Sequence, residues 1–138
     1  DWSSDVCSSD LANTLLVDDT YNASPQAVRA AIDWLATRQG VRVLAMGGLS
    51  ELGESAESEM HALGTYAKSK GIERLVATGT ALPIAGGYGA DAQYFSTHDE
   101  VSNFLIESAR EADVILVKGS RSAQMDRVIN TLKLQQGG

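Results

Sequence analysis

Residues 14–35 read TLLVDDTYNASPQAVRAAIDWL, and the signals of a strand, a loop and a helix follow one another here. The apolar run Thr14–Val17 is short and ends at an acidic pair, which is typical of a buried strand. Ser24 and Pro25 indicate a helix start, with serine as the N-cap and proline at the first helical position. An apolar helix face follows, made by Val28, Ala31, Ile32 and Leu35. The pattern predicts a strand that leads into a covering helix.

The same alternation continues along the chain. Further strands are predicted at Val41–Met46, Arg74–Thr78, Gln93–Phe95 and Asp113–Val117. Helices are predicted at Glu54–Lys70, from the N-cap Thr97 to about Glu111, and from near Ala123 onward, with one helical turn at Ala81–Ala85. Glycines predict helix ends at Gly40 and Gly71 and a loop at Gly86–Gly89. Strands that alternate with helices predict an α/β, Rossmann-like fold: a mostly parallel sheet of five or six strands with helices on both faces.

Ligands of such sheets bind beyond the carboxyl ends of the strands. The loops expected at this edge are 18–22, 47–53, 78–80, Ser96 and 118–122. The last of these, KGSRS, combines two cations, two hydroxyls and a glycine where a strand passes into a helix. Such a loop suits a carboxylate or a phosphate, and a capped turn with solvated charges explains it equally well.

Composition excludes several classes of protein. The 138 residues correspond to one domain. The net charge of −7 argues against a general nucleic-acid binder, which needs Lys and Arg to neutralise phosphates. The longest apolar runs, such as Val114–Val117, are far shorter than the ~20 residues that cross a bilayer. We therefore expect a cytoplasmic protein without nucleic-acid or membrane partners.

The first residues, DWSSDVCSSDL, show neither a helix nor a strand pattern. We interpret residues 1–12 as a non-native or disordered leader and residues 13–138 as the domain, with a native flexible linker as the alternative. The single cysteine, Cys7, lies in this leader, forms no internal disulfide and has no base near it in sequence.

Several kinds of site have no support in the sequence. Neither the phosphate-binding pattern GxxxxGK[ST] nor GxGxxG is present. A phosphorylatable receiver domain would use the acidic pair 18–19 and Lys118, but it also needs an aspartate after the middle strand, which reads RLVAT. His61 and His98 are isolated in sequence, so we expect surface residues and no metal site. The acidic stretch 51–59 is interpreted as a solvated helix start, and no catalytic residue is predicted.

Four segments in order resemble the C-terminal domain of Mur ligases: Asp18–Pro25 (DDTYNASP), Met46–Glu54 (MGGLSELGE), Gly71–Leu75 (GIERL) and Val117–Met125 (VKGSRSAQM). The resemblance covers about Thr14 to Leu134. One departure is Gly48, which stands where the family has an aspartate, with Ser50 or Glu51 as its alternative replacements.

The resemblance implies a role within a larger enzyme. That enzyme would use ATP and Mg²⁺, held mainly by a central domain, to add D-alanyl-D-alanine to UDP-N-acetylmuramoyl-tripeptide in peptidoglycan precursor synthesis. This domain would close over the central domain and be inactive without it and the N-terminal domain. By resemblance, the nucleotide-side residues are Asp19, Tyr21 and Asn22, and the dipeptide-side residues are Lys118, Gly119, Ser120, Arg121 and Ser122. A free-standing α/β module that binds a small molecule or a partner without catalysis is the alternative.

Overall fold

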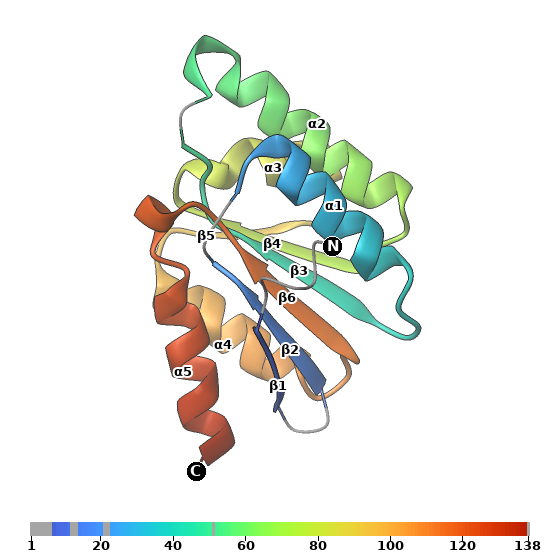
Figure 1. Ribbon diagram of the computed structural model, residues 1–138, viewed down its shortest axis with the longest axis vertical. Coiled ribbons are helices and arrows are strands. Elements are labelled where there is room, and N and C mark those ends of the chain that lie inside the picture. Colours follow the sequence, from blue (N-terminus) through green and yellow to red (C-terminus); the bar gives the residue numbers. More distant parts are fainter. Residues whose placement is uncertain (1–6, 12–13, 21–22, 51, 138) are drawn as a thin grey trace.

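The computed structural model describes residues 7–11, 14–20, 23–50 and 52–137, and its strands form one six-stranded sheet of order β1-β2-β6-β3-β4-β5 (Figure 1). The strands are β1 (Cys7–Leu11), β2 (Thr14–Asp19), β3 (Arg42–Met46), β4 (Arg74–Thr78), β5 (Gln93–Phe95) and β6 (Val114–Lys118). All neighbouring strands pair in parallel along the order β2-β6-β3-β4-β5. Strand β1 pairs antiparallel with β2 at the edge. The predicted mostly parallel sheet is confirmed.

Helices cover both faces of the sheet, as predicted (Figure 1). They are α1 (Pro25–Ala36), α2 (Ala56–Ser69), α3 (Leu82–Tyr88), α4 (His98–Ser108) and α5 (Asp126–Gly137). One hydrophobic core lies between the sheet and α1, α2 and α3, and a second lies between the sheet and α4 and α5. Strand β6 serves both cores, because Val114 and Leu116 belong to the first and Ile115 and Val117 to the second. This two-sided burial explains why its sequence is continuously apolar.

The chain path creates a break in strand order next to β6. From β3 the chain passes outward to β4 and β5, and it then returns through α4 to place β6 between β2 and β3. Lys118, the last residue of β6, is in register with both Asp19 of β2 and Met46 of β3. The loops that follow these three strands therefore leave the sheet side by side, at the kind of switch point where open α/β sheets bind ligands.

Two helix starts predicted from sequence are confirmed. The Ser24 side chain accepts a hydrogen bond from the Ala27 N–H at 3.1 Å, and Pro25 opens α1. The Thr97 side chain accepts one from the Glu100 N–H at 3.2 Å and fixes the start of α4. Both serve N–H groups that lack a partner in the first helical turn.

The predicted loop at Gly86–Gly89 is wrong, because Gly86, Gly87 and Tyr88 form the last turn of α3. The glycines permit a close crossing with α2. A Cβ on Gly87 would lie 1.9 Å from the His61 carbonyl oxygen, and a Cβ on Gly64 of α2 would lie 1.9 Å from the Ile84 carbonyl oxygen. Tertiary packing, which sequence propensity does not show, thus accounts for Gly87 inside α3 and Gly64 inside α2.

Two other boundaries differ from the prediction. Helix α4 ends at Ser108 instead of Glu111. In addition, Cys7–Leu11 forms β1, although we expected no strand in this segment. It pairs with β2 from Cys7 opposite Asp18 to Leu11 opposite Thr14, and backbone groups make this pairing. An edge pairing of this kind does not require an alternating side-chain pattern. The origin of residues 1–12 stays a prediction.

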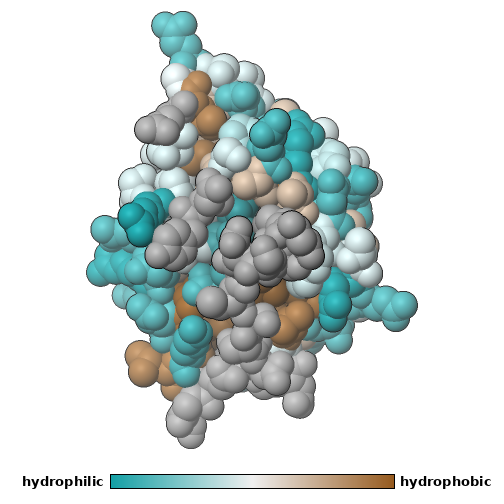
Figure 2. Space-filling model, in the orientation of Figure 1, coloured by the Kyte–Doolittle hydropathy of each residue, from teal (hydrophilic) through white to brown (hydrophobic). Residues whose placement is uncertain are grey.

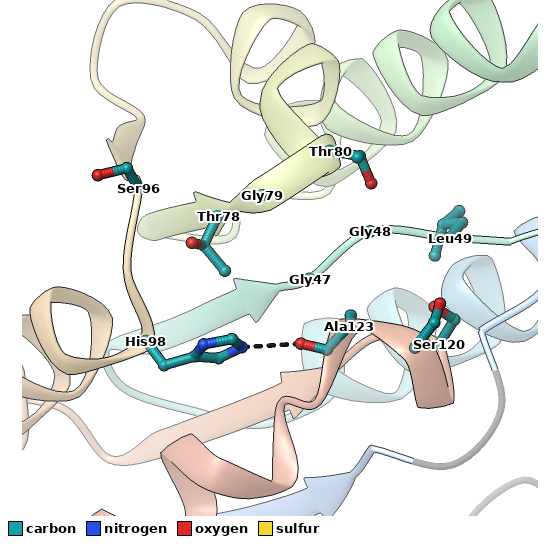
Figure 3. A pocket seen from close by; sticks show the side chains of 11 residues that line it. Gly47, Gly48, Leu49, Thr78, Gly79, Thr80, Ser96, His98, Ser120 and Ala123 are labelled. Carbon is teal, nitrogen blue, oxygen red and sulfur yellow. Dashed lines mark hydrogen bonds between the residues drawn. The ribbon is translucent and has the colours of Figure 1, made fainter.

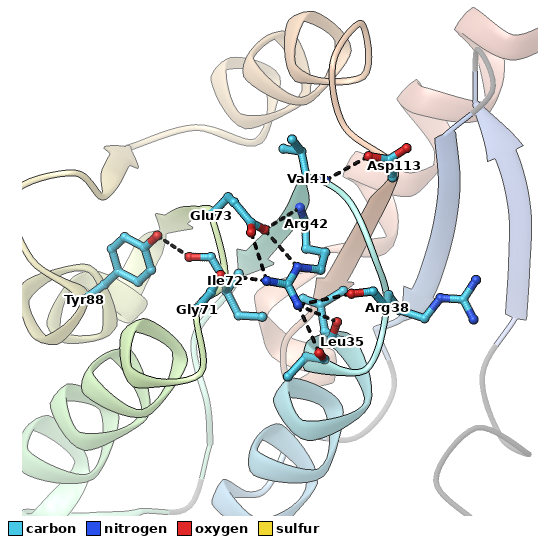
Figure 4. Close-up of polar contacts among 10 residues, drawn as sticks. Leu35, Arg38, Val41, Arg42, Gly71, Ile72, Glu73, Tyr88 and Asp113 are labelled. Carbon is cyan, nitrogen blue, oxygen red and sulfur yellow. Dashed lines mark hydrogen bonds and ion pairs between the residues drawn. The ribbon is translucent and has the colours of Figure 1, made fainter.

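Arg42 anchors the amino end of β3, opposite the predicted ligand edge (Figure 4). Its Nε and Nη2 donate to the Glu73 carboxylate, each at 2.9 Å, and these hydrogen bonds lower the pKa of Glu73. Its Nη1 donates to the carbonyl oxygens of Ala36 and Arg38, and Nη2 also donates to that of Gly71. One guanidinium therefore joins the ends of α1 and α2 to the sheet.

The described part of the surface offers few large apolar side chains. On the face shown in Figure 2, hydrophobic residues form small, separate areas among hydrophilic ones. Among the described residues, the exposed large hydrophobic side chains are Leu82, Tyr94 and Leu134. No helix in the described part of the chain is long and apolar enough to cross a bilayer.

Candidate functional site

A pocket of about 280 Å³ opens at the carboxyl ends of four neighbouring strands (Figure 3). The loops after β3, β4, β5 and β6 each contribute to it, as predicted for this edge of the sheet. Its lining residues are Gly47, Gly48 and Leu49, then Thr78, Gly79 and Thr80, then Ser96 and His98, and finally Ser120, Ser122 and Ala123. Hydroxyl groups, glycine backbone and one imidazole thus surround the space, and the described lining includes no carboxylate. Such a lining suits a small ligand with a hydrogen-bonding, anionic end.

The β6 loop is held firmly against the β3 loop. The Gly47 N–H donates to the Lys118 carbonyl oxygen at 2.8 Å, and the Ser120 N–H donates to the Gly48 carbonyl oxygen at 2.9 Å. The Ser120 and Ser122 hydroxyls lie 3.0 Å apart. Both serines line the pocket, so the structure brings these two predicted substrate-side residues together.

Glycine is required where the two loops meet. A Cβ on Gly119 would lie 3.2 Å from the Gly47 Cα and 2.9 Å from the Met125 Cγ, and a Cβ on Gly47 would lie 2.5 Å from the same Cγ. Gly119, predicted on the substrate side, therefore acts here through packing: it lets the β6 loop lie against Gly47 and over the buried Met125.

Gly48 is packed against a hydroxyl. A Cβ at this position would lie 1.9 Å from the Thr80 Oγ1, so the Thr80 side chain occupies the space that a larger residue would need. Of the alternative replacements for the family's aspartate, Ser50 is exposed and does not line the pocket, and Glu51 lies outside the described residues. The polar group at this point of the pocket is the Thr80 hydroxyl.

Lys118 is buried and does not line the pocket. Its side chain is 1% exposed, and Nζ donates a hydrogen bond of 2.5 Å to Oδ2 of Asp19, which is also buried. Burial lowers the pKa of Lys118 below its ordinary value of 10.5, while the hydrogen bond and the charge of Asp19 oppose this shift. The pair joins the carboxyl ends of β2 and β6, and a contact of Lys118 with substrate stays a prediction.

Arg121 faces a different part of the surface from Ser120 and Ser122. Its side chain is exposed and lines a second, shallow pocket of about 550 Å³ with Thr20, Gln124, Asp126 and Arg127. This pocket borders the β2 loop, where the Asp18 carboxylate accepts a hydrogen bond from the Thr20 hydroxyl at 2.8 Å. The predicted nucleotide-side residues Tyr21 and Asn22 lie outside the described residues.

The last helix begins later than predicted. Arg121–Ala123 form a single 3-10 turn, Gln124 adopts the left-handed conformation with φ 54°, and α5 starts at Asp126. The N–H groups of the first turn of α5 therefore do not directly follow the Ser120 loop. Sequence analysis missed this turn because its residues carry no helix-cap pattern of their own.

His98 is a residue of the site that sequence analysis missed. We expected it to be a solvated surface side chain, but it is half-buried and lines the pocket. Its Nε2 lies 2.8 Å from the Ala123 carbonyl oxygen (Figure 3). The available signal was its position: it follows Thr97 at the carboxyl end of β5, on the edge where ligands were expected.

Metal binding finds no support in the described part of the chain. No group of three or more His, Cys, Asp or Glu side chains there is arranged to hold a metal ion. His61 is exposed on α2 and lines a separate groove with Glu57, Leu82 and Pro83, in agreement with a surface role.

Comparisons with known proteins agree in family and fold. The family model for the Mur ligase glutamate ligase domain matches residues 6–121. The UDP-N-acetylmuramoyl-tripeptide–D-alanyl-D-alanine ligase of Escherichia coli (strain K12) is 38% identical over 127 residues, covering 88% of this chain and 27% of that protein. A crystal structure of MurF from Acinetobacter baumannii has a TM-score of 0.80 at 34% identity, covering 91% of this chain and 29% of that one. The MurF ligase of Thermotoga maritima, solved in complex with ADP, has a TM-score of 0.80 at 24% identity, covering 94% of this chain and 30% of that one. The chain thus spans roughly a quarter of the length of the curated relatives it matches.

Proposed function

The chain belongs to the Mur ligase family as a glutamate ligase domain, and from this we propose that it is the C-terminal, substrate- and nucleotide-closing domain of an ATP-dependent peptide ligase. The proposed enzyme adds D-alanyl-D-alanine to UDP-N-acetylmuramoyl-tripeptide in the cytoplasm, for peptidoglycan precursor synthesis. The named activity of the Escherichia coli relative supports this reaction. Because this chain matches only 27% of that relative, we propose an N-terminal and a central domain as its partners.

The observation that carries the proposal is the placement of Ser120 and Ser122. The segment VKGSRSAQM delivers both hydroxyls to one pocket, beside the backbone of Gly48 and the hydroxyl of Thr80. The carboxylate of a dipeptide accepts hydrogen bonds from hydroxyl and backbone N–H groups, and a pocket of about 280 Å³ suits a ligand of that size. We therefore assign the pocket to the dipeptide, with its carboxylate toward the two serines.

The other predicted substrate-side residues take supporting or neighbouring positions in this proposal. Lys118 and Gly119 support the β6 loop. Lys118 does so through its ion pair with Asp19, and Gly119 through its close approach to Gly47. Arg121 contributes from the adjacent shallow pocket, next to Thr20. It is the cation we place closest to the substrate in the closed enzyme.

ATP and Mg²⁺ belong to the missing central domain in this proposal. The sequence lacks a phosphate-binding P-loop, and the described residues include no three-group metal cluster. The chain's own residues therefore do not fit a complete Mg-ATP site. Asp19, Tyr21 and Asn22 remain the proposed contacts to the nucleotide, and the relative solved with ADP supports nucleotide use in the family.

A chimeric enzyme tests this function. The segment of the Escherichia coli relative that matches this chain is replaced by residues 14–137, and ADP release is measured. We expect release to require both UDP-N-acetylmuramoyl-tripeptide and D-alanyl-D-alanine. The double variant Ser120→Ala/Ser122→Ala is expected to raise the KM for the dipeptide and to leave binding of the UDP-tripeptide unchanged. A folded chimera that binds the UDP-tripeptide but shows no dipeptide-dependent turnover would favour a free-standing binding module.

A further inference from the structure

His98 connects α4 to the turn that carries Ser120 and Ser122. It is the first residue of α4 and follows the N-cap Thr97, whose hydrogen bond to the Glu100 N–H fixes the helix start. From there the imidazole extends to Ala123, the last residue of the 3-10 turn (Figure 3). A helix anchored in the second hydrophobic core is thus joined through one side chain to the turn at the pocket.

The chemistry of this contact fixes the donor. The Ala123 carbonyl oxygen accepts hydrogen bonds and donates none, so the hydrogen must be on Nε2 of His98. The neutral ring is therefore the Nε2–H tautomer, and its Nδ1 carries no hydrogen.

Ala123 lies where the turn separates from the helix. Inside the turn, the Ala123 N–H donates to the Ser120 carbonyl oxygen at 3.0 Å. The bonds that open α5 involve the next two carbonyls: the Arg127 N–H donates to the Gln124 carbonyl oxygen, and the Val128 N–H donates to that of Met125. The Ala123 carbonyl is the point at which His98 holds the far end of the turn.

The near end of the turn is held independently. The Ser120 N–H donates to the Gly48 carbonyl oxygen at 2.9 Å, and the Ser120 and Ser122 hydroxyls are 3.0 Å apart between the two anchors. A turn fixed at both ends keeps these hydroxyls in one arrangement before a ligand arrives. Such preorganisation raises affinity because less conformational freedom is lost on binding.

We propose that His98 is a positioning residue of the pocket: its Nε2–H holds Ala123 and thereby orients Ser120 and Ser122 toward the carboxylate of the ligand. The identity of that ligand, D-alanyl-D-alanine, rests on the proposed function, whereas the orientation of the turn does not. The role assigns to His98 no contact with the reacting atoms.

Two variants at this position separate positioning from general stability. In His98→Gln the amide nitrogen lies as many bonds from Cβ as the imidazole Nε2 and can donate to Ala123, whereas in His98→Asn it lies one bond closer and falls short. His61→Asn is the matched control, because His61 is exposed on α2 and outside the pocket. All four forms of the 138-residue chain are labelled with ¹⁵N.

The first readout requires no ligand. We expect the neutral form of the His98 ring to carry its hydrogen on Nε2, and the amide signals of residues 120–124 to move in His98→Asn but to stay near wild type in His98→Gln and His61→Asn. A ring protonated at Nδ1 alone, or turn amides equally undisturbed in the Asn and Gln variants, would overturn the proposal. The ring measurement on the wild-type chain decides even where a variant does not fold.

The second readout is the Kd for D-alanyl-D-alanine, followed by the same amide signals. Losing one hydrogen bond that orders the site is expected to weaken binding by about two- to tenfold in His98→Asn, with affinity restored in His98→Gln. Equal affinity in both variants would overturn the positioning role. If no form binds the dipeptide while the amide signals of residues 120–124 still move only in His98→Asn, the assignment of the dipeptide as ligand fails. The positioning role of His98 then stands.

Discussion

Lys118 and Asp19 illustrate how a residue can matter to a site without facing it. Both side chains are buried, and their hydrogen bond joins the ends of β6 and β2. A buried charge that loses its partner costs several kcal/mol, so each side chain depends on the other. We therefore interpret the pair as a support for the two loops that leave these strands; the ligand contact that family resemblance implied for Lys118 stays a prediction.

A double-mutant cycle measures this dependence. Lys118→Met and Asp19→Leu are each expected to lower the free energy of unfolding by about 3 kcal/mol, because each removes the ion-pair partner of a buried charge. The double variant is expected to be close to wild type or more stable, since an apolar pair avoids the desolvation penalty. Urea unfolding of the four proteins checks this, and losses that simply add in the double variant would contradict it.

Stability should also depend on pH through Lys118. Burial lowers the pKa of Lys118 in the folded chain, whereas the unfolded chain keeps the proton up to about the ordinary value of 10.5. Between these two values the unfolded state binds more protons, so the contribution of this group to the free energy of unfolding rises with pH. The difference in unfolding free energy between wild type and Lys118→Met is expected to shift in favour of wild type as the pH approaches 10.5. A flat or opposite trend would show that the folded state does not lower this pKa.

The sequence indicated some of these residues and missed others for a physical reason. Ser120 and Ser122 were predicted from the loop KGSRS at a strand end and from the family resemblance, and the structure brings both to the pocket. The burial of Lys118 and the contact of His98 with Ala123 depend on residues 99 and 25 positions away, respectively. Periodicity and capping patterns describe neighbours in sequence, so they do not reveal such contacts.

The pair of helices α2 and α3 depends on glycines at their crossing. Gly64 and Gly87 each face a backbone carbonyl of the other helix, where a Cβ would come within 1.9 Å. Gly86 lies on the same helix as Gly87 but has room, since the nearest atom to a Cβ there is the His61 Cδ2 at 3.9 Å. The three positions therefore separate the effect of close packing from the low helix propensity of glycine.

Alanine substitutions test this distinction. Gly64→Ala and Gly87→Ala are each expected to lower the free energy of unfolding by about 1–3 kcal/mol, because the helices must separate. Gly86→Ala is expected to be neutral or to stabilise by up to about 1 kcal/mol, since alanine favours the helix. Thermal or urea unfolding compares the three. Equal effects at Gly86 and Gly87 would mean that the close approach does not limit packing.

Elements with a strong local signal were predicted well, and those formed by tertiary contacts were not. Helices α1 and α4 start at the predicted caps, Ser24 and Thr97, because one side chain there serves a backbone N–H. Helix α3 was predicted too short because its glycines indicated a loop. Strand β1 was not expected because its pairing is made by backbone groups, which every sequence supplies.

The arrangement of the whole molecule explains why the site lies at one edge. Two cores, one on each face, hold the sheet, and the break in strand order beside β6 brings the loops after β3 and β6 together. The alternation of strands and helices predicted this architecture and this edge. It did not predict which loop residues meet there, because that depends on the strand order, which alternation leaves open.

The proposed closing role predicts no ATP turnover by the chain alone. The sequence lacks a P-loop, and the described residues form no metal cluster. We therefore expect phosphate release from Mg-ATP at the rate of a buffer control, with or without D-alanyl-D-alanine. A phosphate-release assay on the purified 138-residue chain measures this directly, and turnover above the control that persists after repurification would contradict a closing role.

The assignment of the pocket to the dipeptide is tested by titrating the ¹⁵N-labelled chain with D-alanyl-D-alanine. The titration is followed by two-dimensional amide NMR, and L-alanyl-L-alanine is the matched control. We predict saturable shifts in the D-isomer titration, concentrated at Gly48, Thr80, Ser120 and Ser122, and weaker shifts with the L-isomer. Saturable shifts confined to other surfaces, equal responses to both isomers, or no response at millimolar dipeptide would contradict the assignment of this pocket to the dipeptide.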